Sequence, residues 1–184
     1  MTPDRASAVH AMPTPHTFIV YVEDRPGVLN RIVTLFRRRA YNIDSLTVGR
    51  TERTGVSRIT LIARADAHTA RQLEANLYKI VDVLAVEDVT SAPAVVREMA
   101  FIKLGAKFRS EVMQLCEVFR ARIVDVAPGA ITVESTGSQE KIDGLIEALR
   151  PFGIVELVRT GAVAITRGAP AVDATGVDPV QSVA

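Results

Sequence analysis

The feature that most constrains this 184-residue chain is a hydrophobic pattern that changes period in the same order twice. In the first half, two segments whose apolar residues have helical spacing lie between runs of β-forming residues. The strand-like runs are residues 17–23, 43–48, 58–64 and 83–89, and the helix-like segments are residues 28–39 and 70–80. This half therefore predicts a β-α-β-β-α-β unit.

The second half repeats that order. Strands are predicted at residues 95–104, 122–126, 130–134, 153–158 and 162–166, and helices at residues 110–119 and 138–149, begun by Ser110 and Ser138. A short match at an offset of 83 places Phe36-Arg37 over Phe119-Arg120. Two such units predict an α+β fold with two ferredoxin-like domains in tandem.

The domain limits follow from composition. We expect a flexible leader over residues 1–15, a first domain over 16–91, a second over 92–168 and a flexible tail over 169–184. A domain of about 75 residues has a small core and leaves sheet edges uncovered. Association with another copy is therefore expected from the pattern alone.

Composition excludes several classes of protein. Hydrophobic residues make up 48% of the chain, which is too many for a disordered protein, yet no apolar run reaches the about 18 residues of a membrane span. The net charge of +1 argues against a nucleic-acid partner. The single Cys cannot form an internal disulfide, so we expect a reducing, cytoplasmic location.

Residues with catalytic chemistry are sparse. His10, His16 and His68 lack metal-ligand spacing and are expected to be solvated. Cys116 falls on the apolar face of its predicted helix, where packing is the expected role. No phosphate-binding glycine motif occurs. The sequence therefore predicts no catalytic residue and no metal site, and points to binding.

One strand-to-helix connection can bind a small anion. It reads Asp24-Arg25-Pro26-Gly27-Val28-Leu29, with Pro26 expected at the first helical position and Asp24 or Arg25 at the cap. The amides of Gly27, Val28 and Leu29 carry the positive helix end, which suits a carboxylate. Asn42, in the next turn, can both donate and accept. An ordinary β–α turn is the alternative.

The same segments carry a family resemblance. The runs at residues 23–29, 35–36 and 41–48 resemble the small regulatory subunit of acetolactate synthase (acetohydroxyacid synthase), and so do shorter segments at 57–60, 79–83, 97–98, 102–103, 119–120 and 123–126. The resemblance covers about residues 17–168. It implies an N-terminal ACT domain, a C-terminal ACT-like domain, and a homodimer whose paired ACT domains form one sheet.

The resemblance also implies a role in branched-chain amino acid biosynthesis. The small subunit activates a large catalytic subunit, which holds thiamine diphosphate, Mg²⁺ and FAD, and confers feedback inhibition by valine. This chain itself would hold no cofactor. Valine would contact Asp24, Gly27, Val28 and Leu29 of one chain and Asn42 and Ile43 of its partner.

Two positions depart from the family pattern. Asp24 stands where the family usually has Asn, and Ala40 where it usually has Gly. A carboxylate at position 24 attracts the ammonium of an amino acid and repels its carboxylate, whereas Ala40 is strained if its φ is positive.

Three other functions are alternatives. A free-standing tandem-ACT amino-acid sensor would need no catalytic partner. An RNA-binding module would need aromatic residues on the central strands, for which only Phe18, Tyr21 and Phe101 are candidates. A small enzyme would need a site that the sequence does not display.

Overall fold

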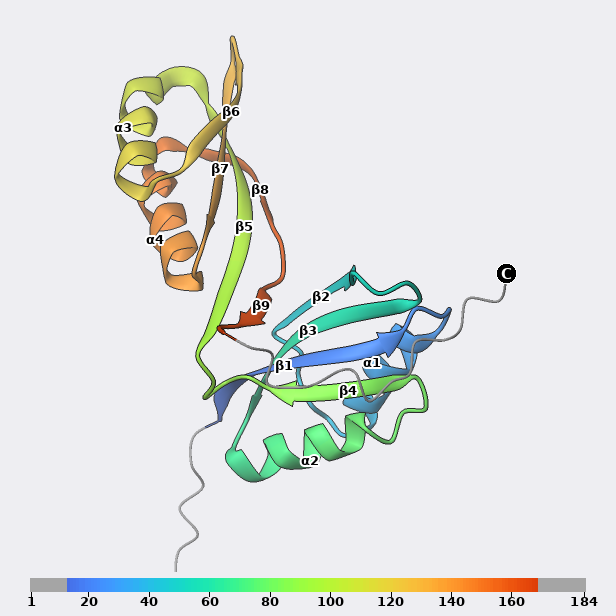
Figure 1. Ribbon diagram of the computed structural model, residues 1–184. Helices are drawn as coiled ribbons and strands as arrows, with labels where there is room; N and C mark the ends of the chain where they lie inside the picture. Colours follow the sequence, from blue (N-terminus) through green and yellow to red (C-terminus); the bar gives the residue numbers. More distant parts are fainter. Residues whose placement is uncertain (1–12, 169–184) are drawn as a thin grey trace, which may run out of the picture. The chain divides into compact units, whose positions relative to one another are not determined.

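The computed structural model describes residues 13–168. The chain divides into two compact units between Ala92 and Pro93, each with its own sheet and hydrophobic core (Figure 1). Residues 1–12 of the expected leader and the whole expected tail, residues 169–184, lie outside the described residues.

Unit 1 has the predicted β-α-β-β-α-β order. Its elements are β1 (Thr14–Glu23), α1 (Val28–Arg38), β2 (Ser45–Arg50), β3 (Val56–Ala65), α2 (Ala67–Leu77) and β4 (Val83–Asp88). The strands form an antiparallel sheet in the order β2-β3-β1-β4. β1 and β3 are therefore central, and β2 and β4 are the edges.

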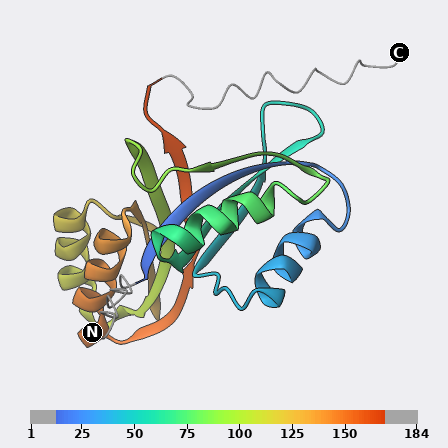
Figure 2. The same ribbon diagram turned by 90° about the horizontal axis from the view of Figure 1, so that it is seen from below.

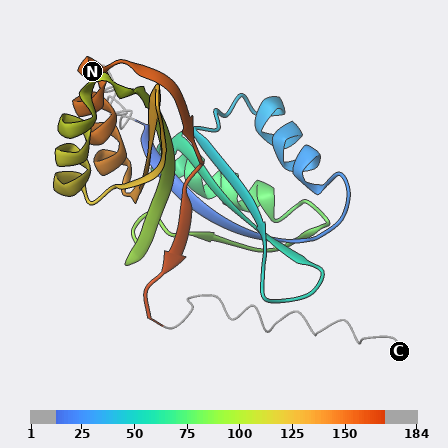
Figure 3. The same cartoon turned by 90° about the horizontal axis from the view of Figure 1, so that it is seen from above.

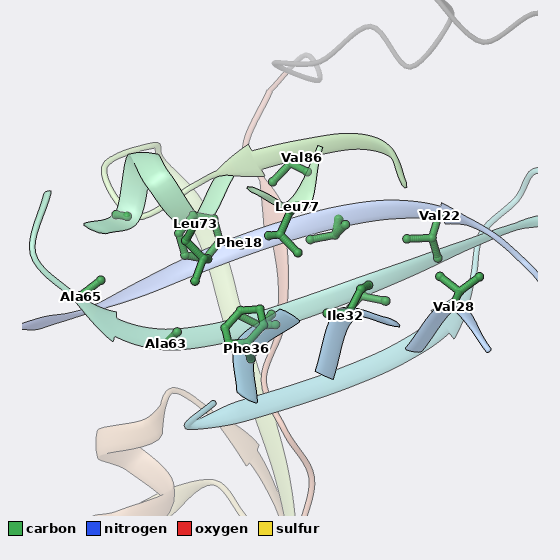
Figure 4. Packing of buried hydrophobic residues seen from close by; sticks show 14 residues of the cluster. Phe18, Val22, Val28, Ile32, Phe36, Ala63, Ala65, Leu73, Leu77 and Val86 are labelled. Carbon is green, nitrogen blue, oxygen red and sulfur yellow. The ribbon is translucent and has the colours of Figure 1, made fainter. Parts of the chain in front are cut away.

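Both helices of unit 1 cover the same face of its sheet, as Figures 1 and 2 show. Alternate residues of β1 point toward them, and in Figure 4 Phe18 and Val22 lie in a layer with Ile32, Phe36 and Leu77. Because α1 joins β1 to β2, it crosses the β2 side of the sheet, whereas α2 crosses the β4 side. The start of α1 is consequently placed beside the end of β1.

Unit 2 repeats this topology with additions. Its elements are β5 (Ala94–Gly105), α3 (Arg109–Phe119), β6 (Arg122–Ala127), β7 (Ala130–Gly137), α4 (Gln139–Leu149), β8 (Ile154–Arg159) and β9 (Val163–Thr166), with 3₁₀ turns at Ala106–Phe108 and Arg150–Phe152. The strand order is β6-β7-β5-β8, and β9 pairs with the first residues of β5. α3 and α4 lie together on one side of this sheet (Figures 1 and 3). The predicted α+β fold of two ferredoxin-like domains is thus confirmed.

Several expected boundaries were wrong. β1 begins at Thr14 and takes in the last two residues of the expected leader. α1 begins at Val28, beyond Pro26, and α3 begins before Ser110, with Phe108 at its N-cap position. Ser138 does cap α4 as predicted, because its hydroxyl accepts a hydrogen bond from the amide of Lys141.

The internal repeat has a different alignment from the one in the sequence. The amide of Tyr41 donates to the carbonyl of Phe36 at the end of α1. In the same way, the amide of Ala121 donates to the carbonyl of Cys116 at the end of α3. These helix-ending bonds align Phe36 with Cys116, an offset of 80, so the Phe36/Phe119 match is not a structural equivalence.

Candidate functional site

The connection between β1 and α1, residues 24–27, forms an exposed turn; we call it the β1–α1 loop. The amide of Asp24 donates to the carbonyl of Gly55 (2.8 Å), and the amide of Arg25 donates to that of Glu23 (2.9 Å). Gly27 then adopts φ 89°, a conformation that favours glycine, and becomes the N-cap residue of α1. The expected cap by Asp24 or Arg25 is wrong because the chain completes this turn before the helix begins.

The start of α1 is open to a ligand. No side chain within residues 13–168 caps this helix, and its first turn contains no acidic residue. A Cβ placed on Gly27 would meet no described heavy atom within 4 Å. The first amides of a helix lack intrahelical acceptors and carry a partial positive charge, so a carboxylate is favoured there.

Charged side chains near the loop are paired weakly. The Asp24 carboxylate lies 3.5 Å from Nε of Arg50 at the end of β2, and both side chains are exposed. Arg25 pairs with Glu23 at 2.9 Å. Exposed pairs of this kind contribute about 0–1 kcal/mol, so neither ion pair adds much to the stability of the loop.

Arg50 was not among the predicted site residues. The signal for it lies in the topology, because the first and second strands of a β-α-β-β unit run parallel with the third between them. The last residue of β2 therefore comes near the end of β1. An argument from local spacing alone does not find such a neighbour.

The turn that carries Asn42 follows a left-handed helix end. The amide of Tyr41 donates to the carbonyl of Phe36 (3.0 Å), and the amide of Ala40 donates to the carbonyl of Arg37 (3.2 Å). These are the two hydrogen bonds of a Schellman motif. Ala40 has φ 56°, so this position does require the left-handed conformation. The rings of Tyr41 and Phe36 pack edge to face, which fixes the direction in which the chain leaves the helix.

The structure does not bring all six predicted site residues together within one chain. Asp24, Gly27, Val28 and Leu29 lie at the start of α1, where the Val28 side chain is buried and its amide donates a long hydrogen bond to the carbonyl of Arg25 (3.4 Å). Asn42, which is exposed, and Ile43, which packs partly against the core, follow the end of the helix. An 11-residue helix is about 16 Å long, so one small ligand cannot touch both groups in one protomer.

An exposed apolar strip runs along the β2 side of unit 1. Among the described residues β2 pairs with β3 alone, which leaves its other edge open. Leu29 and Val33 on α1 are 41% and 40% exposed, and Val48 on β2 is 45% exposed. Leu29 and Val33 are four residues apart and so share one face of the helix.

The remaining reactive residues differ in part from expectation. His16 was expected to be solvated, but it is mostly buried and its Nδ1 lies 2.9 Å from Oδ2 of Asp88, because β1 extends back to Thr14 and pairs with β4. Burial alone would raise the pKa of Asp88, but hydrogen bonds with Thr90 and His16 outweigh it and hold this pKa below its usual range.

His68 is exposed and bonds to Gln72, and His10 lies outside the described residues. Cys116 is buried against the unit 2 core, as predicted, and burial raises the pKa of its thiol. Residues 13–168 contain no group of three or more His, Cys, Asp or Glu side chains arranged to hold a metal ion. No helix in the described part of the chain is long and apolar enough to cross a membrane.

Two family models match the chain in sequence order. The model of an acetohydroxyacid synthase (AHAS) small subunit-like ACT domain matches residues 18–85, and the model described as small subunit of acetolactate synthase matches residues 97–168. The matched segments lie on either side of the division between the two units.

Curated relatives and a solved structure agree with these matches. The chain is 47% identical over 159 residues to the probable acetolactate synthase small subunit of Methanothermobacter thermautotrophicus, covering 85% of this chain and 95% of the relative. It is 43% identical over 155 residues to the acetolactate synthase small subunit of Aquifex aeolicus, covering 83% and 81%.

The crystal structure of the acetolactate synthase small subunit from Thermotoga maritima matches with a TM-score of 0.79 and 36% identity, covering 85% of this chain and 99% of that one. Sequence and structure thus agree over nearly the whole described chain. The chain belongs to the family of acetolactate synthase small subunits, which are regulatory rather than catalytic chains of that enzyme.

Proposed function

We propose that this subunit forms a homodimer through its ACT domains and binds a branched-chain amino acid, valine, at the seam. The bound amino acid inhibits the catalytic subunit that this chain otherwise activates. The contacts would come from Asp24, Gly27, Val28 and Leu29 of one protomer and from Asn42 and Ile43 of the other. Residues 16–91 would then be the effector-binding domain and residues 92–168 the C-terminal regulatory domain.

The observation that carries this proposal is the placement of the two half-sites at opposite ends of one exposed edge. Arg50, at the end of β2, lies beside Asp24, whereas Asn42 precedes the start of β2. If two copies pair their β2 edges antiparallel about a two-fold axis, the start of one β2 meets the end of the other. Asn42 of one protomer then approaches the β1–α1 loop of its partner.

The exposed apolar strip supports the same pairing. Leu29, Val33 and Val48 are exposed in the single chain and lie on the elements that border this edge. Their burial in a dimer would add about 25 cal/mol for each Å² of apolar surface removed from water. Continuation of the sheet would also satisfy the open edge of β2.

The seam suits a small zwitterion. The amides at the start of α1 would take its carboxylate, and the side chains of Asp24 and Asn42 would face its ammonium and remaining polar atoms. Leu29 offers an apolar contact for an aliphatic side chain, whose full burial contributes roughly 1.5–3 kcal/mol. This contribution distinguishes valine, leucine and isoleucine from polar amino acids.

Regulation would arise because the ligand spans two chains. Its binding free energy depends on the geometry of the seam, so occupancy favours one of two dimer packings by its differential affinity. One packing fits the catalytic subunit productively and the other does not. A coupling free energy of about 1–3 kcal/mol is enough for a 5- to 150-fold change in apparent affinity.

The catalytic chemistry would remain in the partner. We propose that the large subunit holds thiamine diphosphate, Mg²⁺ and FAD, and that this chain contributes no cofactor ligand. A cytoplasmic location fits a chain whose one cysteine, Cys116, cannot form an internal disulfide. A free-standing sensor is the alternative, and capture of the large subunit by this chain separates the two.

Asn42→Ala in the reconstituted holoenzyme tests the proposal. Loss of a hydrogen bond to a charged ligand costs about 1.5–3 kcal/mol, so the valine concentration for half-inhibition should rise roughly 10- to 100-fold. Activation of the catalytic subunit without valine should persist, because Asn42 is exposed and supports no core contact.

Arg122→Ala is the matched control. Arg122 stands two residues after the left-handed Arg120, as Asn42 stands two residues after Ala40, and it forms an exposed ion pair with Glu134. Its substitution should leave the inhibition curve unchanged. An unmoved curve for Asn42→Ala, with valine, leucine and isoleucine each titrated, would show that the site is assigned to the wrong residues.

A further inference from the structure

A buried carboxylate lies next to the β1–α1 loop but outside the residues assigned to the ligand. Asp82 occupies the turn between α2 and β4, and its side chain is only 3% exposed. An ionised carboxylate this deep in a protein is costly unless a cation and hydrogen bonds compensate it. Its presence in a connecting turn therefore calls for a specific partner.

Asp82 contacts the chain on both sides of the loop. Its main-chain carbonyl accepts a hydrogen bond from the amide of Glu23, the last residue of β1 (2.9 Å). Its carboxylate Oδ2 forms an ion pair with Nε of Arg31 (2.7 Å), in the first turns of α1, but without hydrogen-bond geometry, so this ion pair is the contact that compensates the buried oxygen. The amide of Arg31 in turn donates to the carbonyl of Gly27 (3.0 Å). Residues 24–27 are consequently held between two contacts to one buried residue.

The α2–β4 turn that presents Asp82 is itself fixed by the backbone. The amide of Ile80 donates to the carbonyl of Leu77 (3.0 Å), and the amide of Val83 donates to that of Ile80 (2.9 Å). Ile80 and Val83 also pack partly against the unit 1 core. The carboxylate is therefore anchored to the core, whereas the loop that it contacts is exposed.

Unit 2 contains a comparable ion pair without such a loop. Glu98 on β5 has a side chain that is 10% exposed and lies 2.5 Å from a guanidinium nitrogen of Arg159 on β8. This pair joins two neighbouring strands, and Arg159 also lies 2.6 Å from Oδ1 of Asp143 on α4. It offers a matched comparison for the effect of removing a buried carboxylate as such.

We propose that Asp82, acting through Arg31, is a positioning residue for the effector site: it holds the β1–α1 loop and the first turn of α1 in the geometry that binds the amino-acid carboxylate. The inference rests on the proposed function for the identity of the ligand. A preorganised loop loses less conformational freedom when the ligand binds. Removal of the Asp82–Arg31 contact therefore lowers the affinity for the ligand without removing a ligand contact.

The experiment compares Asp82→Asn with Glu98→Gln in the holoenzyme titrated with L-valine. Both substitutions remove one buried negative charge while keeping side-chain shape. Asp82→Asn should raise the half-inhibiting valine concentration roughly 3- to 30-fold. Glu98→Gln should leave it unchanged, although both variants lower the urea midpoint of unfolding.

Amide hydrogen exchange of the full-length chain, without any amino acid, gives a second readout. Asp82→Asn should speed exchange at Gly27, Val28 and Leu29 by about threefold or more, and Glu98→Gln should not. The shifts from Arg31→Gln and Asp82→Asn should be non-additive in the double variant, since both break one contact. Arg31→Lys, a milder change, carries the same test if Asp82→Asn does not fold.

The two readouts separate failure of this inference from failure of the proposed function. Equal shifts for Asp82→Asn and Glu98→Gln, or loop exchange that stays at the wild-type rate, would overturn the positioning role. Suppose that valine, leucine and isoleucine do not inhibit the wild-type holoenzyme, but Asp82→Asn still speeds exchange selectively in the loop. That result would overturn the proposed effector but not the role of Asp82 in holding the β1–α1 loop.

Discussion

The first β-to-α connection of unit 1 and its counterpart in unit 2 occupy the same place in the same topology, yet they are built differently. Asp24 in unit 1 and Ala106 in unit 2 both donate their amides to a glycine carbonyl in the adjacent hairpin, Gly55 and Gly129 respectively. Beyond this shared bond, unit 1 turns through an exposed, left-handed Gly27, whereas unit 2 forms a 3₁₀ turn.

The 3₁₀ turn of unit 2 is filled by its own side chains. The ring of Phe108 packs edge to face on that of Phe152, and Nζ of Lys107 lies 5.1 Å above the Phe108 ring. A guanidinium nitrogen of Arg109 donates to the carbonyl of Ala127. The shared topology therefore places a helix start at the same point in both units. The residues of the strand-to-helix connection decide whether a ligand can reach that helix start.

The largest difference between the units should be in the core position that precedes the helix end. Phe36 and Cys116 are aligned by their helix-ending hydrogen bonds, and both are buried. Phe36→Ala should lower the free energy of unfolding of unit 1 by about 3–5 kcal/mol, because it leaves a cavity under α1. Cys116→Ala should cost about 1 kcal/mol in unit 2.

Urea unfolding of the full chain, followed by amide exchange in each unit, measures both changes. Two domains need not unfold in one transition, so each unit is followed by its own amides. Equal costs for the two substitutions would show that the Phe36 side chain contributes no more to its core than the smaller Cys116 does to its own.

The second largest effect should come from closing the open connection. Gly27→Asp would place a carboxylate at the start of α1, where the proposed ligand carboxylate binds, and would strain a residue with φ 89°. Repulsion between two carboxylates about 4 Å apart should weaken valine by about 2 kcal/mol or more, roughly thirtyfold.

Gly105→Asp is the control for this change in unit 2. Gly105 ends β5, has a negative φ and has no described heavy atom within 4 Å of an added Cβ, so it accepts a side chain without strain. Its inhibition curve should match that of the wild-type holoenzyme. A response to Gly105→Asp would instead place an effector site in the second unit.

Much of the fold could be predicted because the order of strands and helices is encoded in local periodicity. Residues 17–23 and 58–64 are rich in β-forming residues, and they fall within the observed β1 and β3 respectively. Helix starts were predicted less well. Pro26 favours the first position of a helix, but the turn at Gly27 overrides that preference. α3 begins at Arg109, after a 3₁₀ turn whose Phe108 packs on the distant Phe152.

The candidate site shows the same division. Gly27 and the amides after it could be found from the sequence because the need for a left-handed residue is local. Arg50, Asp82 and the burial of His16 could not, since each depends on which strands become neighbours. That Asn42 and Gly27 lie at opposite ends of α1 also needs the length of the folded helix.

A smaller change, in the free energy of unfolding, is expected from substitution at a left-handed helix end. Ala40 and Arg120 both have positive φ, and Ala40 has no side chain that could compensate the strain. Ala40→Gly should raise the free energy of unfolding of unit 1 by about 1 kcal/mol. Ala148→Gly, inside α4, should lower that of unit 2 by about 1 kcal/mol. Destabilisation by both would mean that Ala40 is not strained.

The smallest change in valine inhibition is expected from removing one charge at each strand-to-helix connection: the negative charge of Asp24 in unit 1 and the positive charge of Lys107 in unit 2. Asp24→Asn removes the carboxylate that faces Arg50 and, in the proposed complex, the ligand's ammonium. Because Asp24 and Arg50 are both exposed, the loss should be about 0.2–1 kcal/mol, up to about a fivefold rise in half-inhibiting valine. The rise should shrink as salt is added, because exposed charges are screened. Lys107→Gln, at the unit 2 connection, should change neither the concentration nor its salt dependence. A salt-independent shift for Asp24→Asn would mean that position 24 acts through the shape of the turn rather than through its charge.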